Sequence, residues 1–278
     1  IDFETATVAV PFFAGHRPYE MVAFQFSHHT MDQHGKVTHA NEYLNAHPGK
    51  NPNYDFVRQL RIALGDRGTV FMWSHHENTV LNSILRQLAA DPEKPADAEL
   101  LRDFMLSLTV SRSERNIAHE GPRAMFDLCA LAEKIYFHPY TKGSNSIKKV
   151  LPAVLQSSDY LKSRYSKPIY GAQDGIPSKN FTDKIWWEDN GGTPKNPYDI
   201  LQSAFADLPI EDQEKLKEED YLEVTEGGAA TTAYGRLQFE QLDPDARVNI
   251  QKALLKYCEL DTLAMVMVYE AWREWSRS

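Results

Sequence analysis

Cysteine is scarce in this chain, which has only Cys129 and Cys258 among its 278 residues. Both lie in apolar runs and neither has the spacing of a metal-binding motif, so a disulfide framework and a cysteine-rich zinc site are excluded. We expect both to be core residues of a protein in a reducing compartment, which predicts a cytoplasmic location.

A long hydrophobic run is also missing. The sequence contains no stretch of about eighteen apolar residues and no signal peptide, so we expect no membrane association. It opens at Ile1-Asp-Phe-Glu-Thr5 without an initiating Met, and we expect a piece of a longer protein that has other domains. Its content of 42% hydrophobic and 11% aromatic residues is sufficient for one large domain.

An excess of positive charge is absent as well. The formal net charge of -9 argues against non-specific coating of nucleic acid. Residues 207–226 contain nine acidic and two basic residues, which is typical of a solvated face. Residues 134–173 contain seven basic residues and one acidic residue, with aromatic side chains interleaved as in a groove that follows a nucleic-acid strand. The basic residues are Lys134, Lys142, Lys148, Lys149, Lys162, Arg164 and Lys167, and the aromatic ones are Tyr136, Phe137, Tyr140 and Tyr160.

Hydrophobic periodicity predicts an α/β fold. We expect strands at residues 1–5, 22–26, 36–40, 69–73 and 125–131, the first three forming a meander with a turn at His34-Gly35. Helical spacing predicts helices at residues 53–64, 77–90, 146–155 and 244–272, the last with Asp243 as N-cap and Pro244 in its first turn. Residues 165–226, rich in Gly, Pro, Asn and Trp and then in acids, are expected to form an irregular insertion that caps a single domain spanning residues 1–278.

Acidic residues occur in two places where their side chains are expected to meet. Asp2 and Glu4 alternate on the first strand, so their carboxylates point to one face while Phe3 points to the other. Asp261 lies on the apolar stripe of the last helix, one turn from Tyr257. A carboxylate carried into a core without a partner is costly, so Asp261 must lie at the edge of the stripe, pair with a cation or bind a metal. Carboxylate oxygens are the ligands that Mg²⁺ or Mn²⁺ prefers.

These segments resemble the motifs of a known enzyme superfamily. The opening Asp-Phe-Glu-Thr, a carboxylate after a middle strand and the terminal Tyr-Cys-Glu-Leu-Asp-Thr are similar to the three motifs of the DEDD 3′-to-5′ exonucleases, in their tyrosine-bearing branch. Within that superfamily, residues 17–27 and 142–152 resemble a bacterial family of domains of unknown function. The resemblance covers residues 1–155 and 227–275 and implies a ribonuclease H-like fold, in which helices flank a mixed β-sheet.

The resemblance also implies an activity, the hydrolysis of single-stranded nucleic acid by a two-metal mechanism. In this mechanism Tyr257 orients the attacking water. The implied ligands of the two Mg²⁺ or Mn²⁺ ions are Asp2, Glu4, Glu77 and Asp261. The residues expected to contact the substrate are Phe3, Thr5, Lys142, Ser144 and Lys148, the last three because a turn at a helix start suits a phosphate. The substrate is left open between DNA and RNA.

The middle motif departs from the usual form of the superfamily and leaves alternatives open. The superfamily usually has an Asn, then three residues, then Phe and Asp, whereas this chain has Trp73-Ser-His-His-Glu-Asn78. Glu77 therefore takes the carboxylate position, and Asp127 is the competing candidate for it. A catalytically silent nucleic-acid-binding or scaffold module, an endonuclease and a hydrolase of small nucleotides are the alternative functions. The doublets His28-His29 and His75-His76 suggest zinc, but adjacent strand residues point to opposite faces, so each doublet offers one ligand.

Overall fold

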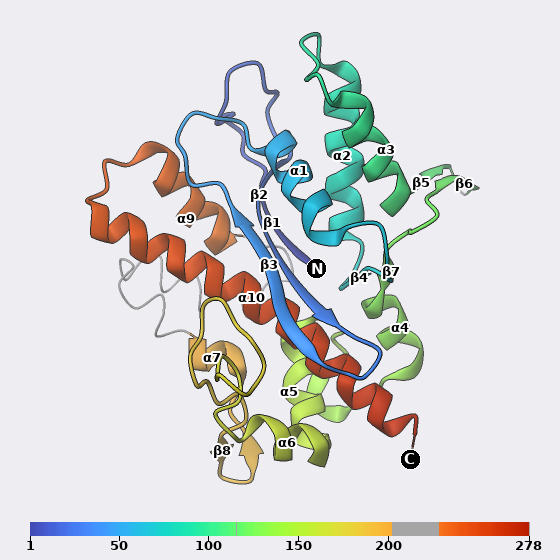
Figure 1. The fold of residues 1–278 in the computed structure, drawn as a ribbon, viewed down its shortest axis with the longest axis vertical. Helices are drawn as coiled ribbons and strands as arrows, with labels where there is room; N and C mark the ends of the chain where they lie inside the picture. Colours follow the sequence, from blue (N-terminus) through green and yellow to red (C-terminus); the bar gives the residue numbers. More distant parts are fainter. Residues whose placement is uncertain (115, 202–227, 278) are drawn as a thin grey trace.

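The computed structural model of the chain has the mixed α/β architecture that the sequence predicts (Figure 1). It describes residues 1–114, 116–201 and 228–277, so the acidic run at residues 207–226 and the end of the insertion lie outside the described residues. The strands are β1 (Asp2–Ala6), β2 (Val22–Met31), β3 (Val37–Leu44), β4 (Phe71–Met72), β5 (Val110–Ser113), β6 (Asn116–Glu120), β7 (Phe126–Asp127), β8 (Asp189–Asn190) and β9 (Thr193–Pro194). The helices are α1 (Asn53–Leu64), α2 (His76–Ala90), α3 (Ala98–Leu108), α4 (Leu128–Ile135), the 3-10 helix η1 (Pro139–Thr141), α5 (Ile147–Ser157), α6 (Asp159–Tyr165), α7 (Pro197–Leu201), α9 (Gly228–Phe239) and α10 (Pro244–Trp275).

The central sheet is the predicted meander. β1, β2 and β3 are hydrogen-bonded in this order and are antiparallel. Gly35, with φ of 84°, supplies the left-handed backbone that the turn between β2 and β3 needs. β4 and β7 form a parallel pair, and the Ile1 nitrogen donates a hydrogen bond of 3.0 Å to the Phe71 carbonyl oxygen. The β4–β7 pair is a separate two-stranded sheet that lies beside the start of β1.

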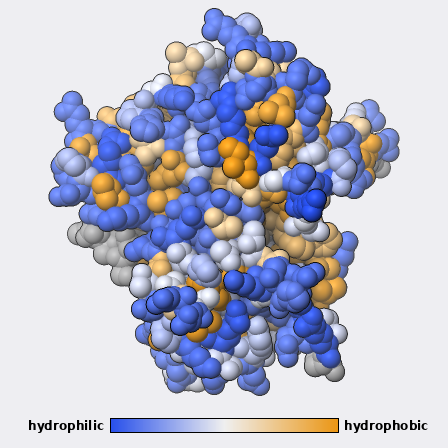
Figure 2. All heavy atoms as spheres, viewed as in Figure 1, coloured by the Kyte–Doolittle hydropathy of each residue, from blue (hydrophilic) through white to orange (hydrophobic). Residues whose placement is uncertain are grey.

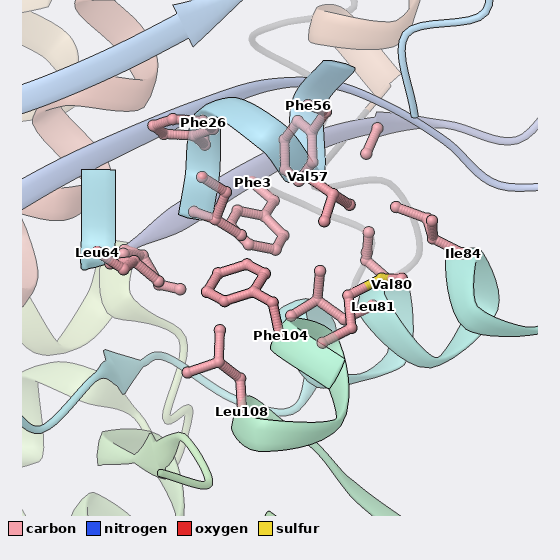
Figure 3. Packing of buried hydrophobic residues seen from close by; sticks show 14 of the residues in the cluster. Phe3, Phe26, Phe56, Val57, Leu64, Val80, Leu81, Ile84, Phe104 and Leu108 are labelled. Carbon is pink, nitrogen blue, oxygen red and sulfur yellow. The ribbon is translucent and has the colours of Figure 1, made fainter. Parts of the chain in front are cut away.

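One face of the sheet is covered by α1, α2 and α3. Phe3 of β1 and Phe26 of β2 contact Phe56 of α1, with ring centroids 4.8 and 5.5 Å apart. Figure 3 shows these rings among aliphatic side chains of the three helices. Apolar burial contributes roughly 25 cal/mol per Å², so this cluster is a main source of stability. The apolar stripes predicted at residues 53–64 and 77–90 are the sides of α1 and α2 that it buries.

The opposite face of the sheet is covered by α10, whose predicted start is confirmed. Asp243 caps the helix by accepting a hydrogen bond of 2.9 Å from the Ala246 N–H. Gln25 donates to the Leu254 carbonyl oxygen and Ser27 bonds to the Thr262 hydroxyl, each across 2.7 Å. These two bonds fix the middle of α10 over β1 and β2.

Two predicted strands are shorter in the structure. The strand predicted at residues 69–73 is reduced to β4, Phe71–Met72. The prediction for residues 125–131 is wrong beyond Asp127, where α4 begins. The physical reason is the Asp127 carboxylate, which accepts hydrogen bonds from the N–H groups of Cys129 and Ala130 and so starts a helix.

The insertion is irregular over its described part, residues 165–201, and packs against α10. Trp186 is fully buried, and the Trp187 indole donates to the Leu155 carbonyl oxygen of α5 across 3.1 Å. These rings belong to the hydrophobic cluster that α5 and α10 share. This part of the insertion therefore packs against the side of α5 and α10, and its role as a cap stays a prediction.

The surface seen in Figure 2 is mainly hydrophilic, with hydrophobic residues scattered singly or in small groups. None of the described helices is both long enough and apolar enough to cross a membrane.

Replacing Asp127 by Ala should lower the free energy of unfolding by about 1 to 2 kcal/mol, because α4 loses its N-cap and the Ser74 N–H loses its acceptor. Urea unfolding followed by circular dichroism measures the change. Asp66→Ala is the control, since its side chain is 96% exposed, and it should change stability by less than about 0.5 kcal/mol. Equal stability of Asp127→Ala and the parent would contradict the capping role.

Candidate active site

The site is built on the face of β1 that α10 covers. Asp2 pairs with Ser27 and Glu4 pairs with Gln25, and residues directly opposite each other on neighbouring strands share a face. Ser27 and Gln25 both bond to α10, so the carboxylates of Asp2 and Glu4 face that helix. Phe3 points to the other face. The predicted alternation on this strand is confirmed.

From α10 come Tyr257, Cys258 and Asp261. Ligand atoms of Asp2, Glu4 and Cys258 lie within 4.8 Å of one another, and the Cys258 thiol donates to Asp2 Oδ2 across 3.4 Å. Asp261 is buried and close enough to Asp2 to raise its pKa. The strand and the helix thus bring their acids together, as the sequence predicts. Cys258 is buried, as expected, but next to these acids rather than in the apolar core.

Burial, and after it crowded negative charge, sets the electrostatics of the site. Burial raises the pKa of Asp2 well above its ordinary value, and the carboxylates of Asp261, Glu4 and Glu77 raise it further. Burial, followed by the charges of Asp2 and Glu4, also raises the pKa of the Cys258 thiol. A cation among these groups removes the repulsion, and the carboxylates, although they stand beside the Cys258 thiol, are ligands that hard cations such as Mg²⁺ and Mn²⁺ prefer. The residues present therefore fit the predicted divalent metal.

Glu77 is the second residue of α2, at the helix start where we expect it. Burial raises its pKa to about 8, although hydrogen bonds from its own N–H and from the Phe3 N–H oppose the shift. Its Oε2 atom is buried and has no hydrogen-bond partner among the described residues. Glu77 thus borders the site from the α2 side of β1, with one carboxylate oxygen still to be satisfied.

The competitor of Glu77, Asp127, has one of its two carboxylate oxygens occupied by hydrogen bonds. The Oδ1 atom accepts from the N–H groups of Ser74, Cys129 and Ala130 at 2.8 to 3.1 Å. These bonds join β7 to the start of α4 and to the segment after β4. Asp127 thus has a structural role at the start of α4, and Glu77 as the third acid stays a prediction.

Within the part of the chain that the structure describes, the histidine doublets do not assemble a zinc site. Among the described residues, neither of the two groups of potential metal ligands includes a member of either doublet. His29 is held between Thr262 and the Tyr170 hydroxyl at 2.7 and 2.9 Å. His76 instead bonds to Thr5 across 3.3 Å at the surface.

Of the two lysines that we expect to contact the substrate, the structure places Lys148 beside Tyr257. Its Nζ atom lies 5.5 Å from the centroid of the Tyr257 ring and 5.7 Å from that of the Tyr198 ring. Lys142 is exposed in the turn before α5, and the Ser144 hydroxyl accepts from the Ser146 N–H across 3.2 Å. Ser144 thus contributes to the start of α5, Lys142 ends η1, and Lys148 lies beside the rings of Tyr257 and Tyr198.

Phe3 and Thr5 lie on either side of Glu4 but differ in their surroundings. Phe3 is 3% exposed and packs in the cluster below α1, so the expectation that its side chain contacts a substrate is wrong, because strand alternation turns it away from the acids. Thr5 is partly exposed beside His76, where contact with a substrate stays a prediction.

Tyr198 completes the site, and no sequence pattern marks it. It lies in α7 of the insertion, and its hydroxyl donates a hydrogen bond of 2.5 Å to Asp261 Oδ1. Burial and then the Asp261 charge raise the pKa of Tyr198, so the phenol stays protonated and donates. Donor and acceptor are 63 residues apart along the chain, beyond the reach of any helix or strand periodicity.

A second group of potential ligands, His39, Glu42 and Glu259, lies beside the site. The Glu259 carboxylate already accepts hydrogen bonds from the Tyr170 and Ser178 hydroxyls and lies 3.1 Å from the His39 ring nitrogen. Burial acts to raise the pKa of Glu259, but the bonds from His39, Ser178 and Tyr170 bring it below its ordinary value. This group is filled by protein donors and holds the insertion against α10.

The family model described as a domain of unknown function, DUF2779, matches residues 1–146. This segment is more than half of the 278 residues. The chain belongs to this family. A search of the curated proteins and a search of the solved structures find no match. The DUF2779 match contains Asp2, Glu4 and Glu77 but ends before α10, so Tyr257 and Asp261 lie outside the matched residues.

In the metal-free DUF2779 chain, Glu77→Gln should stabilise the fold by an amount that grows as the pH rises from about 4.5 to about 8. The native state holds the Glu77 proton up to about pH 8, whereas the unfolded chain releases it near pH 4.5, so the parent loses stability across this window. The slope from this one group is at most about 1.4 kcal/mol per pH unit.

Urea unfolding of the parent and the variant in EDTA measures the difference, in which contributions from the buried histidines cancel. Glu133→Gln, at an exposed position of α4, is the control and should give a difference that does not change with pH. A constant difference for Glu77→Gln would contradict the raised pKa.

Proposed function

We propose that the chain is a metal-dependent 3′-to-5′ exonuclease that hydrolyses single-stranded nucleic acid in a ribonuclease H-like domain. The observation that carries the proposal is the group of Asp2 and Glu4 of β1 with Cys258 of α10, to which Asp261 lies so close that its charge, after burial, raises the pKa of Asp2. Acids arranged in this way suit divalent cations that act on a phosphodiester.

The strand order supports the fold that we propose. The antiparallel sheet β3, β2, β1 lies beside the separate parallel pair β4 and β7, to which the bond from Ile1 to Phe71 joins it. Helices α1 to α3 cover one face of this mixed arrangement and α10 covers the other (Figure 1). A mixed sheet flanked by helices is what the resemblance to the DEDD exonucleases implies.

Each residue of the site has a role in the proposed reaction. Asp2, Glu4, Asp261 and Glu77 would hold the Mg²⁺ or Mn²⁺ ions, which when bound supply water activation and neutralise phosphate charge. Tyr257, one turn from Asp261, orients the attacking water with its hydroxyl. Its ring also contacts Lys148, whose ammonium group holds a phosphate of the strand near the acids.

The basic run of residues 134–173 contributes less to strand binding than its composition indicates. Lys162 lies over the Trp187 ring at 4.7 Å, and Arg164 pairs with Glu270 at 3.5 Å. Phe137, by contrast, is 83% exposed between α4 and η1. We propose that Lys148 and Phe137 mark the path of the strand, since exposed rings stack on bases of any sequence.

A catalytically silent nucleic-acid module is the second candidate, and the position of Glu77 favours it. Glu77 lies outside the compact group of Asp2, Glu4 and Cys258, and its pKa of about 8 keeps it protonated at neutral pH without a cation. If Glu77 stays neutral, the site lacks the charge for a second ion and binds a strand without cleaving it.

Asp2→Asn and Asp261→Asn should each reduce the activity by about 10³-fold or more, equivalent to about 4 kcal/mol of transition-state stabilisation. Both variants should fold, and without metal they should be at least as stable as the parent, because removing one charge relieves the repulsion. The assay is the release of mononucleotides from 3′-labelled and 5′-labelled oligonucleotides in Mg²⁺ and in Mn²⁺.

Asp66→Asn, at an exposed position, is the matched control and should retain full activity. An inactive parent in both metals would favour the silent module. A melting temperature that falls by many degrees in both Asp2→Asn and Asp261→Asn would make these acids structural partners of cations and would contradict the metal site.

Lys148→Ala should weaken the binding of every single strand alike, by about tenfold at low salt, because a phosphate contact carries no base information. The slope of log affinity against log salt should fall by about 0.7, the value for one phosphate contact on a single strand. Fluorescence anisotropy in EDTA measures both, since no cleavage occurs without metal. Lys94→Ala, at an exposed position in the loop between α2 and α3, should change neither, and an unchanged slope in Lys148→Ala would remove Lys148 from the binding site.

A further inference from the structure

Three buried carboxylates of α10 each accept a hydrogen bond from a tyrosine of residues 165–198. The pairs are Tyr165 with Glu270, Tyr170 with Glu259 and Tyr198 with Asp261. All three acids have side chains that are nearly inaccessible to solvent. Burial of an ionised carboxylate is costly without such donors, so the three tyrosines join the insertion to the helix.

The pair of Tyr198 and Asp261 differs from the other two in its location. Asp261 is the acid of this set that lies near Asp2 and contributes to the raised pKa of that residue. Glu259 accepts further bonds from Ser178 and Asn180 at 2.5 and 2.8 Å, on both of its oxygens. The Tyr198 hydroxyl occupies one of the roughly four lone-pair sites of the Asp261 carboxylate, so this bond is compatible with metal ligation.

We infer that Tyr198 is a positioning residue for the metal centre, holding the Asp261 carboxylate in the orientation in which it ligates the ion. The inference rests on the proposed function, and it makes the insertion a part of the active site. Carboxylate ligands in proteins are commonly held by outer hydrogen bonds, and the loss of such a partner weakens metal affinity by about 10 to 100 fold. The short bond of 2.5 Å fits this role.

The Tyr198 ring makes a contact of its own, which can be tested separately from the hydrogen bond of its hydroxyl. Together with the Tyr257 ring it lies around Lys148 Nζ, at 5.7 and 5.5 Å. Tyr198→Phe removes the hydroxyl and keeps the ring, whereas Tyr198→Leu removes both. The phenylalanine variant therefore tests the bond to Asp261 alone, and the additional effect of the leucine variant on strand binding reports on Lys148.

The experiment is a titration of the full chain with Mn²⁺ in the absence of nucleic acid, followed by electron paramagnetic resonance of the free ion. We expect Tyr198→Phe to weaken Mn²⁺ binding by about 10 to 100 fold while the chain stays folded. Tyr165→Phe is the matched control, because it removes the same kind of buried bond to a carboxylate nine residues further along α10. It should lower stability to a similar extent and leave Mn²⁺ binding unchanged.

A double variant separates a direct effect from a general one. If Tyr198 acts through Asp261, then Tyr198→Phe should have no further effect on the Mn²⁺ binding that remains in Asp261→Asn. Additive losses in the double variant would overturn the inference.

Two further outcomes would also overturn the inference. Unchanged Mn²⁺ binding in Tyr198→Phe, in a protein where Asp2→Asn abolishes binding, would refute the role of Tyr198 and leave the proposed function standing. Tighter Mn²⁺ binding in Tyr198→Phe would show that the hydroxyl obstructs the site. Parent-like Mn²⁺ binding in Asp2→Asn would instead refute the metal centre on which the proposed function depends.

Discussion

The burial of carboxylates on α10 is the constraint on which much of the structure depends. The helix is 32 residues long and crosses the sheet with Glu259, Asp261 and Glu270 on buried positions. An acid in such a place needs hydrogen-bond donors, a cation or a proton. The insertion supplies donors to all three, so it is held to the core by polar contacts as well as by the buried ring of Trp186.

The register of β1 ties the acids to the hydrophobic core. Asp2 and Glu4 face α10 because Phe3 faces α1. The packing of one face of this strand therefore fixes which side chains lie on the other face. A slip of one residue would push both carboxylates against the Phe56 ring and turn Phe3 toward Asp261. The cost of burying two charges among aliphatic side chains excludes that register, so the core packing shown in Figure 3 also positions the site.

Much of this arrangement can be predicted from the sequence, because it follows from local periodicity. The period of two on residues 2–4 and the helical period around Asp261 place the acids on defined faces, and the structure brings those faces together. Asp127 shows the limit of this reasoning. The short apolar run that follows it predicts a strand, but in the structure the Asp127 carboxylate caps a helix there. Tyr198 shows another limit, because a bond between residues 63 apart depends on the path of an irregular insertion and leaves no periodic trace.

Asp261 accepts a hydrogen bond from Tyr198 of the insertion and is also a proposed ligand of the ion, so the insertion is coupled to ion binding. If the Tyr198 hydroxyl favours the ligating orientation of Asp261, a bound ion must in turn favour the docked position of Tyr198 by the same free energy, because coupling between two binding events is reciprocal. A bound cation also offsets the repulsion that raises the pKa of Asp2, and it stabilises the folded chain in proportion to the logarithm of its concentration. The acids that repel one another without an ion would therefore become, with an ion bound, the groups that hold β1, α10 and the insertion together.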